Sequence, residues 1–413
     1  MQKFKKITDH RVTLFLFFLC WFAYFMSYIG RLNYSSAMTA MIQEEVLAKS
    51  EAGFISMVYF FAYGIGQLCN GILGDRVHPG KMIFTGLGVA ALANLFMGFV
   101  GNFVLMSLIW GINGYAQAMI WPPIIRIFAE MLEGDKKIKF CINIVSSQVV
   151  GTLGAYLIAA GVMWLIDWKA VFAAAALCLG AMAVVWKWGF GRVEKFSMEH
   201  GYLPEETVGN GGKEQKEKGS MKGILLGSGL IAVIFPVVIH GMLKDGVTTW
   251  VPTFITETYF TSPAFSILVT TVLPIFNLTG AYAAQYIYRK CKKSECKAAI
   301  VFFGIATVAV AGIWAGKSYS MILTIVLFAL ITASMMAVNT LFVNMLPLRF
   351  EQQGRVSTVS GFLNSMAYLG TAVSTFTIGV MVEKLGWNIT IGSWVILTAA
   401  AWICCVIFRN KKF

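Results

Sequence analysis

Long runs of apolar residues, separated by short polar segments, make up most of this chain of 413 residues. A helix needs about 20 apolar residues to cross the hydrocarbon layer of a membrane. Twelve runs reach that length, and we therefore predict an all-α membrane protein whose surroundings are the lipid bilayer. The predicted spans are roughly 12–41, 50–73, 82–101, 103–131, 138–166, 169–190, 221–257, 263–288, 297–316, 319–346, 354–382 and 387–408.

The longest polar stretch divides these spans into six and six. It covers residues 191–220 and contains the sequence LPEETVGNGGKEQKEKG, whose composition is typical of a flexible linker. We predict an N-terminal six-helix bundle over 1–190, a cytoplasmic linker over 191–220 and a C-terminal six-helix bundle over 221–413.

The two halves also repeat spacings between particular residues. RLNYSSAMTAMIQE begins at Arg31 and KDGVTTWVPTFITE begins at Lys244, and each has a glutamate thirteen residues later. Glycine-threonine pairs at 151–152 and 370–371 are each followed by a tryptophan seventeen residues after the glycine. Parallels of this kind predict two pseudo-symmetric bundles, as in transporters built from internal repeats.

Charge indicates the orientation of the spans. Of 33 Lys and Arg residues, three lie within spans and four in the segments opposite the termini, so the rest share a side with the termini. The positive-inside rule then predicts cytoplasmic termini in a multi-pass protein of the cell membrane, which we expect to be a bacterial inner membrane. Dispersed charges between apolar spans argue against nucleic-acid binding.

The sequence offers no chemistry typical of an enzyme. It has four histidines and eight cysteines, without a nucleophile and base arrangement or a metal-ligand spacing. We therefore expect neither enzymatic activity nor a metal or cofactor. We also expect a monomer, and its partner to be a small anionic solute, phosphorylated or carboxylated.

Charged residues deep within spans are the strongest indication of a binding site, because burying a charge is costly. Arg31 and Lys244 are such cations, and Asp245 is the acid at comparable depth. Adjacent helical positions differ by about 100°, so we expect Asp245 to face away from Lys244. At least one cation then lacks a protein partner and awaits an anion, although Arg31 as a hydrogen-bonding link between helices is an equal alternative. Arg126 differs, because Glu130 follows it by one helical turn, and we assign this pair a structural or gating role.

The segment GILGDRVHPGK at 71–81 resembles the cytoplasmic signature of the major facilitator superfamily, with Gly71, Asp75 and Arg76 at its defining positions. That resemblance implies a fold of two six-helix bundles and a gating or structural role for these three residues.

Three further segments, RLNYSSAM, YGIGQLCNGILGDRVHPGK and QAMIWPPIIR, together resemble the organophosphate:phosphate antiporter family over nearly the whole chain. The resemblance implies that one cation in each half and inward-facing aromatic residues bind a phosphoryl group. Carried over by position, these residues are Arg31, Lys244, Tyr24, Tyr28, Tyr63, Trp121 and Tyr368. Gln67 and Gln148 stand where the glycerol-phosphate branch has a lysine and a histidine, and His240 precedes Lys244 by one turn. We count these three as candidate substrate-binding residues as well.

Three functions remain open from the sequence. The first is a secondary transporter that exchanges an organophosphate for inorganic phosphate by alternating access. The second is a proton-coupled symporter of an organic anion such as a carboxylate, with His240 or Asp245 carrying the proton. The third is a membrane sensor that binds a sugar phosphate without moving it.

Overall fold

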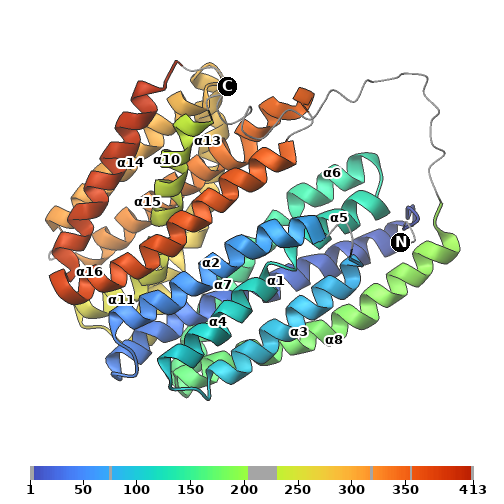
Figure 1. Ribbon diagram of the computed structural model, residues 1–413, viewed down its shortest axis with the longest axis horizontal. Coiled ribbons are helices and arrows are strands. Elements are labelled where there is room, and N and C mark those ends of the chain that lie inside the picture. The colour runs from blue at the N-terminus through green and yellow to red at the C-terminus, as the bar shows by residue number, and fades with distance from the viewer. Residues whose placement is uncertain (1–3, 74–76, 203–229, 317–319, 354–355, 411–413) are drawn as a thin grey trace. The chain divides into compact units, whose positions relative to one another are not determined.

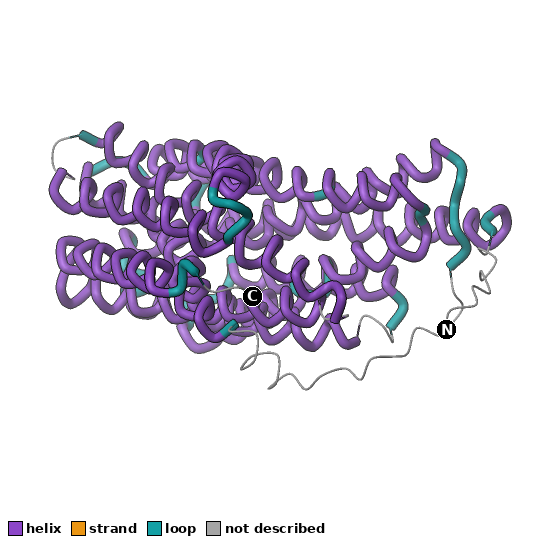
Figure 2. The backbone as a smooth tube through the Cα atoms, turned by 90° about the horizontal axis from the view of Figure 1, so that it is seen from above, coloured by secondary structure: helices purple, strands orange, loops and turns teal. Residues whose placement is uncertain are grey.

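The computed structural model describes residues 4–73, 77–202, 230–316, 320–353 and 356–410, and every regular element in these ranges is a helix. Figure 2 shows helices joined by short loops throughout the described chain. Eleven helical stretches of this part are long and apolar enough to cross a membrane. The last of them breaks at Gly386 (φ 74°, ψ 173°), so its two arms correspond to the last two of the twelve predicted spans. The predicted all-α membrane fold is confirmed.

The described residues of the N-terminal half form eight helices, and Figure 1 labels them. They are α1 (His10–Gln43), α2 (Lys49–Leu73), α3 (Pro79–Met97), α4 (Phe103–Gln117), α5 (Trp121–Met131), α6 (Gly134–Asn143), α7 (Val145–Leu165) and α8 (Trp168–His200). Helix α3 packs along α8 and against α4. Helix α8 continues to His200, so the first ten residues of the predicted linker are helical, and residues 203–229 lie outside the described ranges.

The described part of the C-terminal half is also helical, with two π-helical turns and one 3-10 segment. Its elements are α10 (Ile231–Gly241), η1 (Met242–Gly246), α11 (Val247–Tyr259), α12 (Pro263–Thr270), α13 (Val272–Lys290), α14 (Glu295–Gly316), α15 (Met321–Asn339), η2 (Thr340–Met345), η3 (Leu346–Gln353) and α16 (Val356–Ile407). Helix α16 packs against α10 and α14, and α13 packs against α15.

Polar caps start four of these helices. The side chains of Asn102, Asp167, Ser262 and Ser320 accept hydrogen bonds from backbone N–H groups three residues later, at 3.1, 2.8, 3.3 and 3.3 Å respectively. Such caps satisfy donors that have no partner within the helix. They explain why α4, α8, α12 and α15 begin where they do.

Contacts group the chain into two compact units. The first contains Met1–Ala40 and Phe61–Gly211, and the second contains Met41–Phe60 and Gly212–Phe413. The first half of α2 therefore belongs to the contact network of the C-terminal unit. The salt bridge between Lys49 Nζ and Glu257 Oε2 (3.0 Å) and a hydrogen bond from the Ser50 backbone to Glu383 (2.7 Å) hold it there.

The exterior carries large apolar side chains. Trp164, Leu177 and Val308 are 83%, 75% and 74% exposed, whereas Trp110, Trp186 and Trp250 are almost fully buried. Water-soluble proteins rarely expose extended apolar surface. This surface suits the hydrocarbon of a lipid bilayer, in which helices are favoured because their backbone hydrogen bonds are satisfied internally.

Candidate functional site

Arg31 lies in the middle of α1 against two tyrosine rings. Its guanidinium carbon is 4.6 Å from the centre of the Tyr63 ring and 5.5 Å from that of Tyr28. A guanidinium that stacks on an aromatic face keeps its N–H groups, which lie in its own plane, directed sideways. This geometry suits bidentate hydrogen bonding to an oxyanion.

The aromatic cluster extends from Arg31 toward α5. The Tyr28 and Tyr24 rings meet edge to face at 5.3 Å, and Tyr24 lies 4.5 Å from Trp121, ring centre to ring centre. Trp121 is the first residue of α5, which starts there because Pro122 and Pro123 have no N–H to continue the preceding helix. The structure thus brings together five of the predicted site residues, from α1, α2 and α5. We call them the Arg31 cluster: Tyr24, Tyr28, Arg31, Tyr63 and Trp121.

Other polar residues of the N-terminal half occupy nearby helical positions. Gln67 is half-buried one turn after Tyr63 on α2, and Gln148 is half-buried in the first turn of α7. The hydroxyls of Ser27 and Ser35 donate to carbonyls of α1 itself, at 2.7 and 2.8 Å. Their hydrogens are therefore already used within the helix.

Lys244 lies in η1, a π-helical turn between α10 and α11. Its ammonium is 3.2 Å from each carboxylate oxygen of Asp245, and both side chains are largely buried. The prediction that Asp245 faces away from Lys244 is therefore wrong. A π-helix turns less per residue than an α-helix, and the flexible lysine side chain closes the remaining angle.

The other C-terminal candidates lie on α10 and α16. His240 is 2% exposed, with Nδ1 3.2 Å from the Val237 carbonyl and with Nε2 lacking a hydrogen-bond partner among the described residues. Tyr368 is half-buried and stacks on Phe60, with ring centres 6.4 Å apart and planes at 18°.

Repeated glycines bring a second helix close to each cation-bearing helix. A Cβ at Gly151 of α7 would lie 3.0 Å from the Phe25 carbonyl oxygen, and a Cβ at Gly370 of α16 would lie 2.2 Å from that of Val238. Phe25 and Val238 each precede the cation of their half by six residues. The predicted parallel between the halves is thus a three-dimensional one.

We expect Gly370→Ala to destabilise the protein by about 1–3 kcal/mol, because the new methyl group would overlap backbone and force α10 and α16 apart. Gly361→Ala on the same helix is the matched control, since nothing lies within 4 Å of its added Cβ. Thermal unfolding in detergent measures both variants. Equal melting temperatures for the two would show that this close approach is not required.

Arg126 pairs with Glu130 as expected, with Nε 2.6 Å from the carboxylate, and its Nη1 donates to the Val77 carbonyl at 2.9 Å. Asp75 and Arg76 lie outside the described residues, and Gly71 lies in the last turn of α2. Sequence reasoning missed Arg349 in the C-terminal half. Its Nε donates to the buried Glu295 at 2.7 Å and its Nη2 donates to the Lys293 carbonyl at 2.6 Å. No local motif indicated this link, because Arg349 and Glu295 are 54 residues apart in the sequence.

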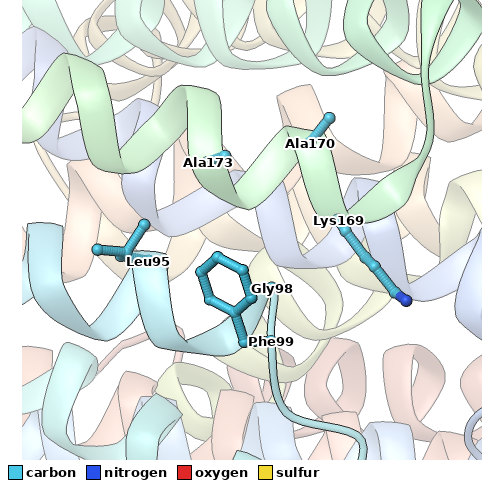
Figure 3. A pocket seen from close by; sticks show the side chains of 6 residues that line it. All are labelled: Leu95, Gly98, Phe99, Lys169, Ala170 and Ala173. Carbon is cyan, nitrogen blue, oxygen red and sulfur yellow. The ribbon is translucent and has the colours of Figure 1, made fainter.

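A crevice of about 300 Å³ lies between the end of α3 and the start of α8 (Figure 3). Leu95, Gly98, Phe99, Ala170 and Ala173 line it together with Lys169. One charged side chain among apolar neighbours lacks the converging polar groups of a specific anion site. We therefore do not assign the substrate to this crevice.

Comparisons with known proteins identify the family. A model of the Major Facilitator Superfamily matches residues 20–375. A probable hexose phosphate transport protein of Chlamydia pneumoniae is 23% identical, with 95% of this chain and 90% of that protein covered. The glycerol-3-phosphate transporter of Bacillus subtilis is 24% identical, with coverage of 96% and 91%. The crystal structure of a bacterial homologue of the human lysosomal transporter Spinster has a TM-score of 0.82 at 11% identity and covers 98% of this chain and 99% of that one.

These relatives confirm the resemblance to organophosphate transporters that the sequence motifs indicated. The family model covers most of the chain, and the fold agrees with it. The chain therefore belongs to the Major Facilitator Superfamily, whose members are multi-pass membrane transporters and not enzymes.

Proposed function

We propose that this protein transports a phosphorylated organic solute in exchange for inorganic phosphate by alternating access. The observation that carries the proposal is the Arg31 cluster, in which a membrane-embedded guanidinium lies on tyrosine rings. The names of the relatives support a phosphorylated substrate, since they are transporters of hexose phosphate and glycerol-3-phosphate. Those names also make a non-transporting sensor the less favoured alternative.

Each candidate residue has a role in this proposal. Arg31 binds two phosphoryl oxygens through its parallel N–H groups, and Lys244 contributes a compact second charge. Hydroxyls of the tyrosines, including Tyr368, donate to the remaining oxygens. Gln67, Gln148 and His240 supply neutral polar groups for the organic part of the substrate.

Exchange follows from the charge of the spans. Arg31, Lys244 and Asp245 together leave one net positive charge deep within the apolar segments. A net charge is costly to keep in a closed, water-free state. A bound anion compensates that charge, so the loaded carrier changes conformation more readily than the empty one. Phosphate on the return step then favours exchange over net transport.

We also propose an orientation of the chain in the membrane and a division into domains. Both termini face the cytoplasm, and bundles over 1–190 and 221–413 flank the linker 191–220. Gly71, Asp75 and Arg76, with the Arg126–Glu130 pair, form the cytoplasmic gate. We propose a monomer in the inner membrane of a bacterium.

One observation favours the second candidate, a proton-coupled symporter of an organic anion. His240 is buried and precedes Lys244 by four residues in the sequence. Its Nε2 has no hydrogen-bond partner in the described structure. A histidine in this setting is a natural proton carrier. Uptake that a pH gradient drives without internal phosphate would support this candidate.

Counterflow tests the proposed function. Purified protein in proteoliposomes loaded with unlabelled phosphate should accumulate labelled phosphate from outside, and external hexose phosphate or glycerol-3-phosphate should inhibit that uptake. Carboxylates without a phosphoryl group should inhibit much less. Absence of phosphate counterflow by correctly inserted protein, together with uptake of a carboxylate, would refute the proposal.

A further inference from the structure

The π-helical turn that carries Lys244 and Asp245 is held by side-chain hydroxyls. Thr371 on α16 shares its hydroxyl hydrogen between the carbonyls of Gly241 at 3.0 Å and Ala367 at 3.2 Å. Ser374 shares its hydrogen between the carbonyls of Met242 at 3.3 Å and Thr371 at 3.0 Å. Thr248 and Thr249 donate to the carbonyls of Lys244 and Asp245, the latter at 2.7 Å. A widened turn weakens the helical hydrogen-bond pattern, and inside a membrane such carbonyls need other donors.

Helix α16 also fixes the position of this turn. A Cβ at Gly246 would lie 1.8 Å from the Ser374 hydroxyl oxygen, so the end of η1 lies directly against α16. Hydroxyl groups bond to carbonyls at both ends of η1, and α16 packs closely against it. These contacts indicate that the π-turn is a stable element of the fold. The π-turn therefore brings the Lys244 and Asp245 side chains together.

The Asp245 carboxylate is an anionic partner for Lys244 within the protein. Both oxygens of Asp245 are 3.2 Å from the ammonium, and the lysine and aspartate side chains are 15% and 27% exposed. A phosphoryl group that binds Lys244 must displace this carboxylate or share the ammonium with it. Charge pairs with restricted access to water interact more strongly than exposed pairs.

From this geometry we propose that Asp245 is a positioning residue that acts through Lys244 as an internal competitor of the substrate. This inference rests on the proposed exchange of phosphate. In the absence of substrate the carboxylate neutralises Lys244, and during binding it yields the ammonium to the phosphoryl group. Asp245 thereby weakens substrate binding and, by recapturing Lys244, speeds substrate release.

The test measures KM and maximal rate of phosphate counterflow for Asp245→Asn. We expect KM to fall about tenfold and the maximal rate to fall as well, because loss of the competing charge tightens binding and slows release. Asp245→Glu restores the charge and should return both values toward those of the wild type. A residue with a merely structural role would lower the rate with KM unchanged or raised, and that result would overturn the inference.

Removal of Asp245 leaves Lys244 as an uncompensated charge, so the single variant is expected to be less stable without ligand. Added phosphate should then raise its melting temperature more than that of the wild type, since stabilisation grows with affinity. The double variant Lys244→Gln/Asp245→Asn removes both charges and avoids this instability. Its KM for phosphate should rise above that of the wild type, and an unchanged KM would remove Lys244 from the site and refute the inference.

The outcomes separate this inference from the proposed function. Wild-type protein without phosphate counterflow overturns the exchange itself, and the inference with it. Wild-type protein with normal counterflow, together with an unchanged KM in Asp245→Asn, overturns the inference alone.

Discussion

Replacement of Arg31 by lysine should reduce phosphate exchange at least about 100-fold although the charge is kept. A guanidinium offers two parallel donors to an oxyanion, whereas an ammonium acts as a single point charge, and one strong charge-assisted interaction is worth about 1.5–3 kcal/mol. The contacts of the Arg31 guanidinium with the Tyr63 and Tyr28 rings add a second loss, because a lysine ammonium does not reproduce them. Counterflow rates normalised to the amount of inserted protein give the measurement.

Arg192 provides a matched control for this substitution. Its guanidinium carbon lies 3.6 Å from the centre of the Trp188 ring, and the residue is exposed on α8. Arg192→Lys therefore removes the same kind of stacked guanidinium away from the Arg31 cluster and should leave exchange near the wild-type rate. Equal rates in Arg31→Lys and Arg192→Lys would exclude Arg31 from substrate binding.

The helical architecture was predictable from the sequence, because a helix that crosses a membrane requires a continuous apolar run of about 20 residues. Within the described residues, eleven long apolar helical stretches, one of them broken at Gly386, correspond to the twelve predicted spans. The repeated glycine-threonine pairs at 151–152 and 370–371 also correspond to equivalent helix contacts, at Gly151 and Gly370. These features depend on residues close in sequence or on a repeat that the sequence itself displays.

The relation between Lys244 and Asp245 was not predictable from helical periodicity. An α-helical angle of about 100° separates adjacent side chains, but this segment forms a π-turn. The turn depends on donors from Thr371 and Ser374, which lie more than a hundred residues away in the sequence.

The Arg31 cluster was predicted in composition and not in geometry. Tyr24 and Tyr28 share a helical face with Arg31, so their proximity follows from α1 alone. The contacts of Tyr63 and Trp121 depend on how α2 and α5 pack against α1, which no local pattern specifies. The resemblance to a known family was therefore the source of those two residues.

The pH dependence of binding should distinguish exchange from proton symport. A phosphate monoester loses its second proton near pH 6, and a site with Arg31 and Lys244 prefers the doubly charged form. If the proposed site is correct, the affinity for a phosphorylated substrate should rise about tenfold between pH 5 and pH 7, in proportion to the dianionic fraction. Inhibition of phosphate counterflow by glycerol-3-phosphate at fixed internal pH provides the measurement.

A proton symporter of a carboxylate should show the opposite trend over this range, because the carboxylate is already ionised and the co-transported proton becomes scarce as the pH rises. Titration of His240 would add its own contribution, since it lies one turn before Lys244. The measurement therefore includes His240→Gln, in which a rise due to the ligand persists and a rise due to the histidine disappears. An affinity that stays constant or falls between pH 5 and pH 7 in both proteins would contradict binding of the dianion and favour the symporter. The reason is that the affinity of a site selective for the dianion must increase with the dianionic fraction of its ligand.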